Sequence, residues 1–226
     1  MTRPIKIDFV SDVSCPWCII GLKGLEEALA RVGDLVDADI RFQPFELNPH
    51  MPAEGQDLVE HVAQKYGSTP EQYFERREMI RARAAELGFT IAAGSAAGRV
   101  WNTFDAHRLL HWAALQGEGR QRALKLALFE AYFTDGKNPG DHQVLTEAAA
   151  KAGLDPNEAS QVLSSDLYTD EVRAAEHSWQ RQGISGVPAI IIDERYLISG
   201  GQPADAFEQA LRRIAAEEPA AVESTA

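Results

Sequence analysis

The sequence predicts an α/β fold in which a long helical block interrupts a small sheet. Three observations support this prediction. Residues 5–47 read as a strand, a helix and a second strand, and residues from about 50 to 182 follow helical periodicity. Strand signals return at residues 188–199, and one more helix follows them. We therefore expect the strands from both ends of the chain to form one sheet, with the helical block inserted between them.

The composition is that of an ordinary globular protein. The chain has 226 residues, of which 45% are hydrophobic and 25% are charged, so it can bury a core without a disulfide. Acidic side chains outnumber basic ones by 34 to 22, a formal net charge of −12, which argues against a nucleic-acid or anionic-membrane partner. No apolar run reaches the roughly 18 residues of a membrane span, and no signal-peptide pattern is present. We expect a cytoplasmic protein, in which a close cysteine pair is more often catalytic or metal-binding than structural.

The N-terminal segment predicts a strand–helix–strand unit. Apolar side chains alternate along residues 5–10, which indicates a strand. Residues 16–32 carry apolar side chains at helical spacing, and Gly33 is placed to end that helix. Residues 38–47 read as a second strand, and Pro44 marks an edge or an end of it.

The block that follows contains a series of helix signals. Thr69 and Gln72 form a capping box, and Asn102 is predicted to be the N-cap of a helix that carries Asp105. The predicted helices run from Thr69 to Gly88, from Asn102, over 120–133, from Asp141 to Gly153, over 155–163 and from 169 to Gly183. Six aromatic residues are expected to form the core of this block, or in part to line a groove for unfolded substrates: Trp101, Phe104, Trp112, Phe129, Tyr132 and Phe133.

The C-terminal segment predicts a hairpin and a helix. A β-branched run at 188–193 and a second run at 196–199 are separated by two turn residues. Pro203 falls near the first turn of the last helix. Residues 217–226 are expected to be a frayed tail.

Without the helical block the order is βαβ–α–ββα, which is the layout of a thioredoxin fold. The sequence therefore predicts a thioredoxin fold with a large inserted all-helical domain. We expect a discontinuous thioredoxin-like domain at residues 1–49 and 168–218, an inserted domain at 50–167, and a flexible tail at 219–226.

The two cysteines of the chain, Cys15 and Cys18, lie where the first strand meets the first helix. The first N–H groups of a helix are unpaired and its N-terminal end is positive, so a thiolate, which is the nucleophilic form, is stabilised there. Cys18 follows one turn later on the same face, close enough for a disulfide. Pro16 fits the first turn, where its missing N–H is not needed. This spacing favours a redox pair in which Cys15 attacks a substrate disulfide and Cys18 resolves the intermediate.

Three other interpretations of the pair stay open. A zinc site needs four ligands, and no second cysteine pair or nearby histidine completes the set, so we expect no metal. A structural disulfide across so short a loop would add little stability. The third alternative is a pair of inert thiols. Trp17 brings no positive charge between the cysteines, so a redox pair here is expected in the reducing half of the range from about −270 to −120 mV.

The segment around Pro188 predicts a backbone that docks substrate. Pro188 opens a strand after Gly186 and Val187, and in a thioredoxin fold this position carries a cis-proline beside the cysteines. Such a proline donates no N–H and leaves the backbone of Val187 to pair with an extended substrate segment.

Several motifs carry a resemblance to a known family. They are SDVSCPWCIIG (11–21), PFELNP (44–49), NTFDAHRLLHWA (102–113), LFEAYFTDGKNPGD (128–141), GISGVPAIII (183–192) and ISGGQP (198–203). Over nearly its whole length the chain resembles the DsbA-like thioredoxin-fold oxidoreductases, specifically their FrnE-like branch. It is more distantly similar to 2-hydroxychromene-2-carboxylate isomerases and kappa-class glutathione transferases, which typically have a serine at the position of Cys15. The resemblance implies a thiol–disulfide oxidoreductase or isomerase with no metal and no tightly bound cofactor, and glutathione or a thioredoxin system as its redox partner.

Five further residues are weighed as members of the site. Asn48 reads first as a turn residue, and Asn102 as an N-cap, with a groove or glutathione contact as the alternative for Asn102. His107 and His111 lie one turn apart, but the glutamate of a metalloprotease motif is missing between them. The resemblance places their helix opposite the cysteines, so His107 is also a candidate to shape the substrate groove. Asp12 either influences proton transfer at the pair or only caps the loop.

Three functions fit these residues. The first is a cytosolic thiol–disulfide oxidoreductase or isomerase acting on a disulfide-containing protein or small molecule, with Cys15 as nucleophile and Cys18 as resolving thiol. The second is a glutathione-dependent isomerase or transferase, with Cys15 in the glutathione-activating position. The third is a non-enzymatic holdase whose helical block binds exposed apolar segments. The expected substrate contacts are Pro16, Trp17, Asn48, Asn102, His107, Val187 and Pro188. A homodimer through the helical block stays open, although no heptad pattern supports it.

Overall fold

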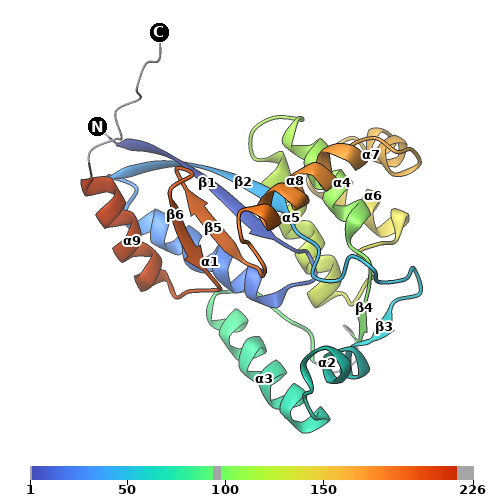
Figure 1. Cartoon of the computed structure of the whole chain (residues 1–226). Coiled ribbons are helices and arrows are strands. Elements are labelled where there is room, and N and C mark those ends of the chain that lie inside the picture. The colour runs from blue at the N-terminus through green and yellow to red at the C-terminus, as the bar shows by residue number, and fades with distance from the viewer. Residues whose placement is uncertain (1, 94–97, 218–226) are drawn as a thin grey trace.

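A four-stranded mixed sheet lies at the centre of the computed structural model, which describes residues 2–93 and 98–217 (Figure 1). Its strand order is β2–β1–β5–β6. Strands β1 and β2 run parallel, and β5 is antiparallel to both of its neighbours. The strands are β1 (Arg3–Ser11), β2 (Val36–Pro44), β5 (Ala189–Ile192) and β6 (Tyr196–Ser199). The parallel pair is joined by a helix, as the sequence predicts for a strand–helix–strand unit.

Helices make up most of the remaining structure. They are α1 (Pro16–Arg31), α2 (Leu58–Tyr66), α3 (Pro70–Glu86), α4 (Phe104–Ala114), α5 (Arg120–Phe129), α6 (His142–Lys151), α7 (Pro156–Leu163), α8 (Thr169–Arg181) and α9 (Ala204–Ala216). Figure 1 shows α4 to α7 gathered beyond one end of the sheet, with α2 and α3 below it. The element order is therefore the expected βαβ unit, helical block, helix, hairpin and helix. None of the helices within the described ranges is long and apolar enough to cross a bilayer.

The block after residue 50 is not helical throughout, which corrects the sequence prediction. Strands β3 (Gln56–Asp57) and β4 (Arg99–Val100) pair antiparallel as a separate two-stranded sheet. Two residues are too few for a period-two pattern to appear in the sequence. The helix expected over 120–133 is α5 followed by a π-helical segment, Glu130–Thr134.

Two predicted boundaries also differ. The N-cap of α4 is Thr103, not Asn102, although the Asn102 side chain still accepts the Phe104 N–H at 2.9 Å. The hairpin between β5 and β6 has a three-residue connection, because Ile192 pairs with Tyr196. The predicted tail at 219–226 lies outside the described residues.

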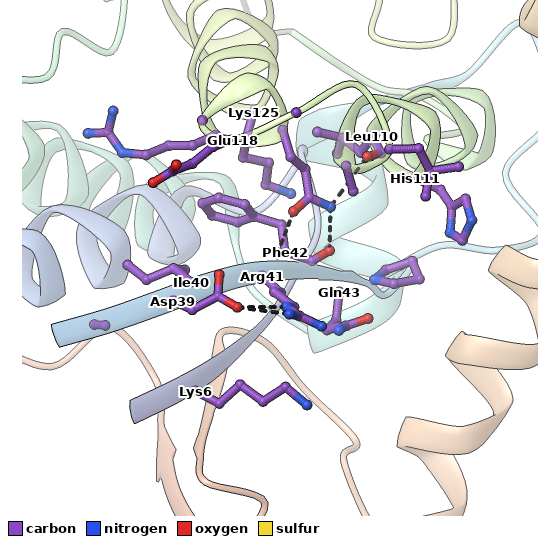
Figure 2. Close-up of a pocket in the computed structure, with 18 of the residues that line it drawn as sticks. Lys6, Asp39, Ile40, Arg41, Phe42, Gln43, Leu110, His111, Glu118 and Lys125 are labelled. Atoms are coloured by element: carbon purple, nitrogen blue, oxygen red, sulfur yellow. Dashed lines mark hydrogen bonds and ion pairs between the residues drawn. The ribbon is translucent and has the colours of Figure 1, made fainter. Parts of the chain in front are cut away.

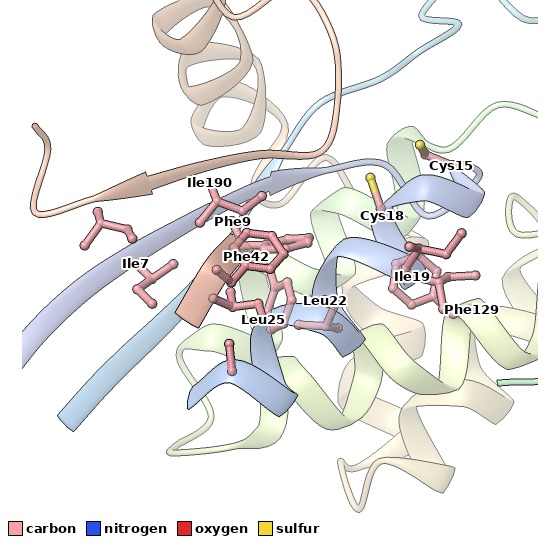
Figure 3. Packing of buried hydrophobic residues seen from close by; sticks show 14 of the residues in the cluster. Ile7, Phe9, Cys15, Cys18, Ile19, Leu22, Leu25, Phe42, Phe129 and Ile190 are labelled. Atoms are coloured by element: carbon pink, nitrogen blue, oxygen red, sulfur yellow. The ribbon is translucent and has the colours of Figure 1, made fainter. Parts of the chain in front are cut away.

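The main core joins the sheet, α1, α9 and part of the helical block (Figure 3). Phe129, Tyr132 and Phe133 were expected in the core of the block, but they pack in the same cluster as Cys15 and Cys18. Of the other expected aromatics, Trp112 lies in a second cluster within the block, and Trp101 and Phe104 are only partly buried. The helical block thus completes the core on which the cysteine pair rests.

Gly24 on α1 and Gly201 in the chain after β6 let these two segments come close together. A Cβ on Gly24 would lie 2.8 Å from the Gln202 carbonyl oxygen, and one on Gly201 would lie 2.8 Å from the Trp17 carbonyl oxygen. A side chain larger than hydrogen has no room at either position. This packing sets the position of α1, and so of the cysteines at its start, relative to the C-terminal half of the fold.

Candidate active site

Cys15 is the N-cap of α1, and Pro16 is its first helical residue. The backbone of Cys15 is extended (φ −94°, ψ 113°), and its side chain caps no backbone N–H. The Cys18 N–H donates to the Cys15 carbonyl oxygen at 3.1 Å. The Cys15 sulfur therefore lies at the positive end of the helix, with Cys18 one turn behind it.

The two cysteines are free thiols in different surroundings (Figure 3). Cys18 is fully buried, whereas Cys15 is 4% exposed and lines a pocket. The Cys15 Sγ donates to the Val187 carbonyl oxygen at 3.6 Å. The peptide bond between Val187 and Pro188 is cis. A Cβ on Gly21 would lie 3.0 Å from Pro188 Cγ, so α1 and this loop are in close contact beside the cysteine pair.

A pocket of about 400 Å³ opens beside Cys15. Five of the sequence-predicted site residues line it: Cys15, Pro16, Trp17, Asn48 and Val187. Its other walls are mainly apolar and aromatic, from Leu47, Leu58, Val62, Tyr66, Tyr73, Ile80, Ile91, Val100, Tyr132 and Phe133. The polar members are Ser14, His61, Arg76 and Arg77. Volume and lining are those of a small-ligand site.

Sequence reasoning offered the aromatics that include Tyr132 and Phe133 as partial lining of a groove, but it missed most of the other residues of this pocket wall. Tyr73 comes from α3, and Tyr132 and Phe133 come from the π-helical segment, far from Cys15 in the chain. The Tyr132 hydroxyl donates to the Arg99 carbonyl oxygen at 2.9 Å, which holds its ring in place. The aromatic cluster was visible in the sequence, but only the fold shows that one side of it faces the cysteines.

Asn48 connects the pocket to α2. Its side-chain oxygen accepts a hydrogen bond from Lys65 Nζ at 2.8 Å, and the same amine donates to the Leu47 carbonyl oxygen at 2.8 Å. The Asn48 carbonyl oxygen accepts the Met51 N–H, as the turn prediction implies. Asn48 thus combines turn geometry with a place in the pocket wall.

Asp12 is a buried anchor beneath the cysteine loop. Its carboxylate accepts the Ser14 N–H at 3.1 Å and the Leu47 N–H at 2.7 Å, and lies 3.6 Å from His107 Nε2. Burial by itself would raise the pKa of this carboxyl, but His107 and the two N–H donors outweigh it, and the pKa lies below the ordinary value. Asp12 therefore ties the loop before Cys15 to the segment after β2.

His107 and Asn102 do not line the pocket beside Cys15. His107 is buried on α4, and its side chain faces the Asp12 carboxylate rather than the pocket. The Asn102 amide nitrogen donates to the Met51 carbonyl oxygen at 3.4 Å, which ties the start of α4 to the segment after Asn48. In the described structure both residues hold neighbouring segments together.

A second cluster of charged side chains, of which Glu46 and Glu176 are buried, lies near His107. The guanidinium of Arg173 pairs with the carboxylates of Glu46 and Glu176 and stacks on the ring of Phe104. Burial, and then the nearby Glu176, raise the pKa of Glu46, while Arg173 opposes that shift. The cluster links α8 to the segment after β2.

The helical block also supplies a lysine that the sequence did not point to. Lys125 on α5 is fully buried, and electrostatic interactions connect it with Cys18, Asp12 and Cys15. Burial raises the pKa of the Cys18 thiol, and the Cys15 sulfur raises it further, while Lys125 acts in the opposite direction. No local signal marked Lys125, because lysines on helices usually face solvent.

A second and larger hollow, of about 1290 Å³, has Lys125 among its lining residues (Figure 2). It runs between β2 and the helices α4 and α5. In this hollow the Gln121 side chain pairs with the backbone of Phe42, accepting its N–H at 3.0 Å and donating to its carbonyl oxygen at 2.9 Å. In the described ranges no cluster of three or more histidine, cysteine or carboxylate side chains is arranged to hold a metal ion.

The fold and the cysteine pair together define a thioredoxin-like domain with inserted helices. A family model described as a DSBA-like thioredoxin domain matches residues 6–212. The chain belongs to this family, whose members are oxidoreductases and isomerases.

Individual proteins show the same relationship. The chain is similar to a probable DsbA oxidoreductase, SCO1869, from Streptomyces coelicolor, with 34% identity, a TM-score of 0.88, and coverage of 95% of this chain and 92% of that one. It is 29% identical over 212 residues to the uncharacterized protein YwbO of Bacillus subtilis, covering 93% of this chain and 96% of the other. The cytosolic disulfide reductase DsbM of Pseudomonas aeruginosa with GSH shares the fold at 18% identity, with a TM-score of 0.61 and coverage of 92% and 98%.

Proposed function

We propose that the protein is a thiol–disulfide oxidoreductase that uses Cys15 and Cys18. The Cys15 thiolate attacks one sulfur of a substrate disulfide, which forms a mixed disulfide and releases one substrate thiolate. Cys18 then attacks the Cys15 sulfur, forms the Cys15–Cys18 disulfide and releases the second substrate thiolate. Two electrons pass from the dithiol to the substrate, and glutathione or a thioredoxin system returns them.

The observation that carries this proposal is the unequal placement of the two sulfurs. Cys15 lines the pocket at the start of α1, while Cys18 is fully buried behind it. A substrate disulfide therefore reaches Cys15 first, and Cys18 acts on the mixed disulfide. This is the division of roles that a nucleophilic and a resolving thiol require.

Val187 and Pro188 supply the docking backbone in this proposal. The Val187 carbonyl oxygen already accepts a contact from the Cys15 thiol. An extended substrate segment bound there places its sulfur beside Cys15. Pro16, Trp17 and Asn48 form the adjacent pocket wall.

The pocket size favours a small substrate. About 400 Å³ accommodates a small-molecule disulfide or one apolar side chain of a protein, but not a folded surface. We propose a cytoplasmic role with glutathione as reductant or co-substrate, in line with the similarity of the fold to the cytosolic disulfide reductase DsbM with GSH. A glutathione-dependent isomerase or transferase is the second candidate, because the mainly apolar pocket beside Cys15 would also suit that chemistry.

The decisive experiment uses Cys18→Ser, with Cys15→Ser as its matched partner. The oxidoreductase mechanism predicts that Cys18→Ser accumulates a mixed disulfide, visible by intact-mass spectrometry, and loses dithiol turnover. Cys15→Ser should form no mixed disulfide. A redox titration of the wild type in glutathione buffers, followed by tryptophan fluorescence, should show one two-electron midpoint.

Other outcomes would redirect the assignment. Full turnover in Cys18→Ser would contradict the dithiol mechanism, and glutathione-dependent isomerisation retained in that variant would favour the second candidate. A holdase would be indicated if the wild type showed no redox couple and the Cys15→Ala variant still suppressed aggregation.

A further inference from the structure

The pocket beside Cys15 has positively charged side chains in its walls and no negatively charged ones. Arg76 and Arg77, both on α3, are among its lining residues, and none of the described lining residues is an aspartate or a glutamate. The protein as a whole has the opposite balance, with 34 acidic side chains against 22 lysines and arginines. A pocket lined in this way favours an anionic ligand.

The two arginines differ in their partners. The Arg77 guanidinium donates to the Tyr73 hydroxyl at 2.7 Å and to the Ala92 carbonyl oxygen at 3.4 Å. Arg76 is exposed, and within the described structure its guanidinium makes no hydrogen bond and no ion pair. A guanidinium presents parallel N–H donors that match the two oxygens of a carboxylate. Arg76 is therefore the side chain in this pocket that is best placed to bind a carboxylate.

Tyr66 on α2 relates this guanidinium to the reactive sulfur. Tyr66, Arg76 and Cys15 line the same pocket. Partial burial raises the pKa of the Tyr66 hydroxyl, the Cys15 sulfur raises it further, and Arg76 opposes the shift. The hydroxyl thus lies within electrostatic reach of both groups. One small molecule can therefore present a sulfur to Cys15 and a carboxylate to Arg76.

The remaining walls favour an apolar body on this ligand. Most of them are aliphatic or aromatic: Leu58, Val62, Ile80, Ile91, Val100, Tyr132 and Phe133. Burial, and then Lys65, lower the pKa of His61, so this imidazole is mostly neutral at pH 7. Such walls bind a ring or a branched chain. Glutathione fits less well, because its ammonium would find no acidic partner among the described lining residues.

We propose that the pocket selects a small disulfide that combines an apolar ring or chain with a carboxylate, and that Arg76 binds this carboxylate. The inference rests on the proposed dithiol mechanism. Cys15 attacks the sulfur of the arm held in the pocket, and the other half of the substrate leaves as a thiolate. Cys18 then attacks Cys15 Sγ, the Cys15–Cys18 disulfide forms, and the bound arm leaves as a second thiolate.

Matched disulfides test the preference for negative charge. The reduced protein is mixed with the meta isomer of dithiodibenzoate or of dithiodibenzamide, which have the same rings and the same disulfide but differ in charge. Oxidation of the protein is followed by acid quenching and intact-mass spectrometry. Each rate is divided by the rate of the same disulfide with mercaptoethanol, which removes differences in intrinsic reactivity. We expect the benzoate to be favoured about 10-fold. Equal normalised rates would overturn the inference.

Glutathione disulfide, normalised in the same way, tests the apolar body. We expect the protein to react more slowly with it than with the benzoate. A preference for glutathione disulfide would overturn the choice of an apolar ligand and would favour the glutathione-dependent candidate.

Arg76→Gln tests the residue, and Arg81→Gln is its matched control. Both positions are on α3 and both substitutions change the net charge equally, but Arg81 pairs with Glu78 and does not line the pocket. Arg76→Gln should lose the preference for the benzoate while its rate with the benzamide stays unchanged. Arg81→Gln should keep the wild-type preference. If Arg76→Gln also kept it, the assignment of Arg76 would be wrong.

A binding measurement separates this inference from the redox proposal. Meta-methylthiobenzoate has the ring and the carboxylate but no disulfide, so it binds without reacting. Tryptophan fluorescence, with Trp17 in the pocket wall, should show about 10-fold tighter binding of this acid than of its amide, and Arg76→Gln should abolish the difference. If this preference held but neither disulfide oxidised the protein, the dithiol mechanism would fail and the anion-selective pocket would stand. Equal binding of acid and amide would overturn the inference.

Discussion

Replacing Gly24 with alanine should destabilise the protein, although the same change in a helix normally stabilises it. Alanine in place of a helical glycine is ordinarily worth about 0.5–1 kcal/mol. At Gly24, however, the added Cβ would lie 2.8 Å from the Gln202 carbonyl oxygen and 3.5 Å from the ring of Phe207. The first contact is with backbone, which cannot rotate away, so α1 or the 200–203 segment must shift.

Overpacking of this kind costs about 1–3 kcal/mol. After subtraction of the helix-propensity gain, we expect Gly24→Ala to lower the free energy of unfolding by about 1 kcal/mol. Urea titration should show a lower midpoint with an unchanged slope, which indicates lost stability rather than a changed unfolded state. Because Gly201 packs on Trp17 in the same segment, a shift in the tryptophan fluorescence should accompany the loss.

The matched control is Gly33→Ala, at an exposed position just after the same helix. A Cβ there would meet its nearest atoms at 3.6 and 3.8 Å, which are ordinary contacts. Its stability should stay within about 0.5 kcal/mol of the wild type. If Gly24→Ala were as stable as Gly33→Ala, the inferred close packing of α1 against the 200–203 segment would be wrong.

Two further predictions concern the residues beneath the cysteine pair. Phe129→Ala should lower the free energy of unfolding by about 3–5 kcal/mol, because this ring is fully buried in the main core; a loss below about 1 kcal/mol in urea titration would contradict that packing. Asp12→Asn should cost about 1–3 kcal/mol at neutral pH, because one amide can accept only one of the Ser14 and Leu47 N–H groups. The folded-state pKa of Asp12 is lowered, so its carboxylate stabilises the fold above the unfolded-state pKa and loses this effect as the pH falls through the folded-state value. The difference between wild type and Asp12→Asn should therefore shrink on acidification, and a constant difference would count against the charge interaction.

Much of the architecture could be predicted because it depends on short-range patterns. Alternation marked β1, helical spacing marked α1, and Thr69 of the predicted capping box accepts the expected backbone N–H. Asp141 and Asp155, at which the sequence placed the starts of two helices, also accept N–H groups of their first turns. The spacing of Cys15 and Cys18 was sufficient to place both thiols on the first turn of a helix. Steric and hydrogen-bonding rules act over a few residues here, so the local sequence contains the information.

The shortest strands and the exact first residues of helices were harder to predict from the sequence. Strands β3 and β4 have two residues each, and they exist because residues 56–57 meet residues 99–100 across the fold. Asn102 and Thr103 are both acceptable N-cap residues, so local chemistry alone did not choose between them.

The tertiary structure alone decided what surrounds the cysteine pair. Tyr132 and Phe133 become pocket walls, and Lys125 becomes a buried side chain, because the inserted helices close over the start of α1. A lysine that faces solvent and one that is buried look alike in a helical sequence. Burial and charge pairing arise from contacts between distant segments, so the sequence determined the cysteine pair and its helix, whereas the tertiary structure determined the pocket beside Cys15 and the burial of Lys125.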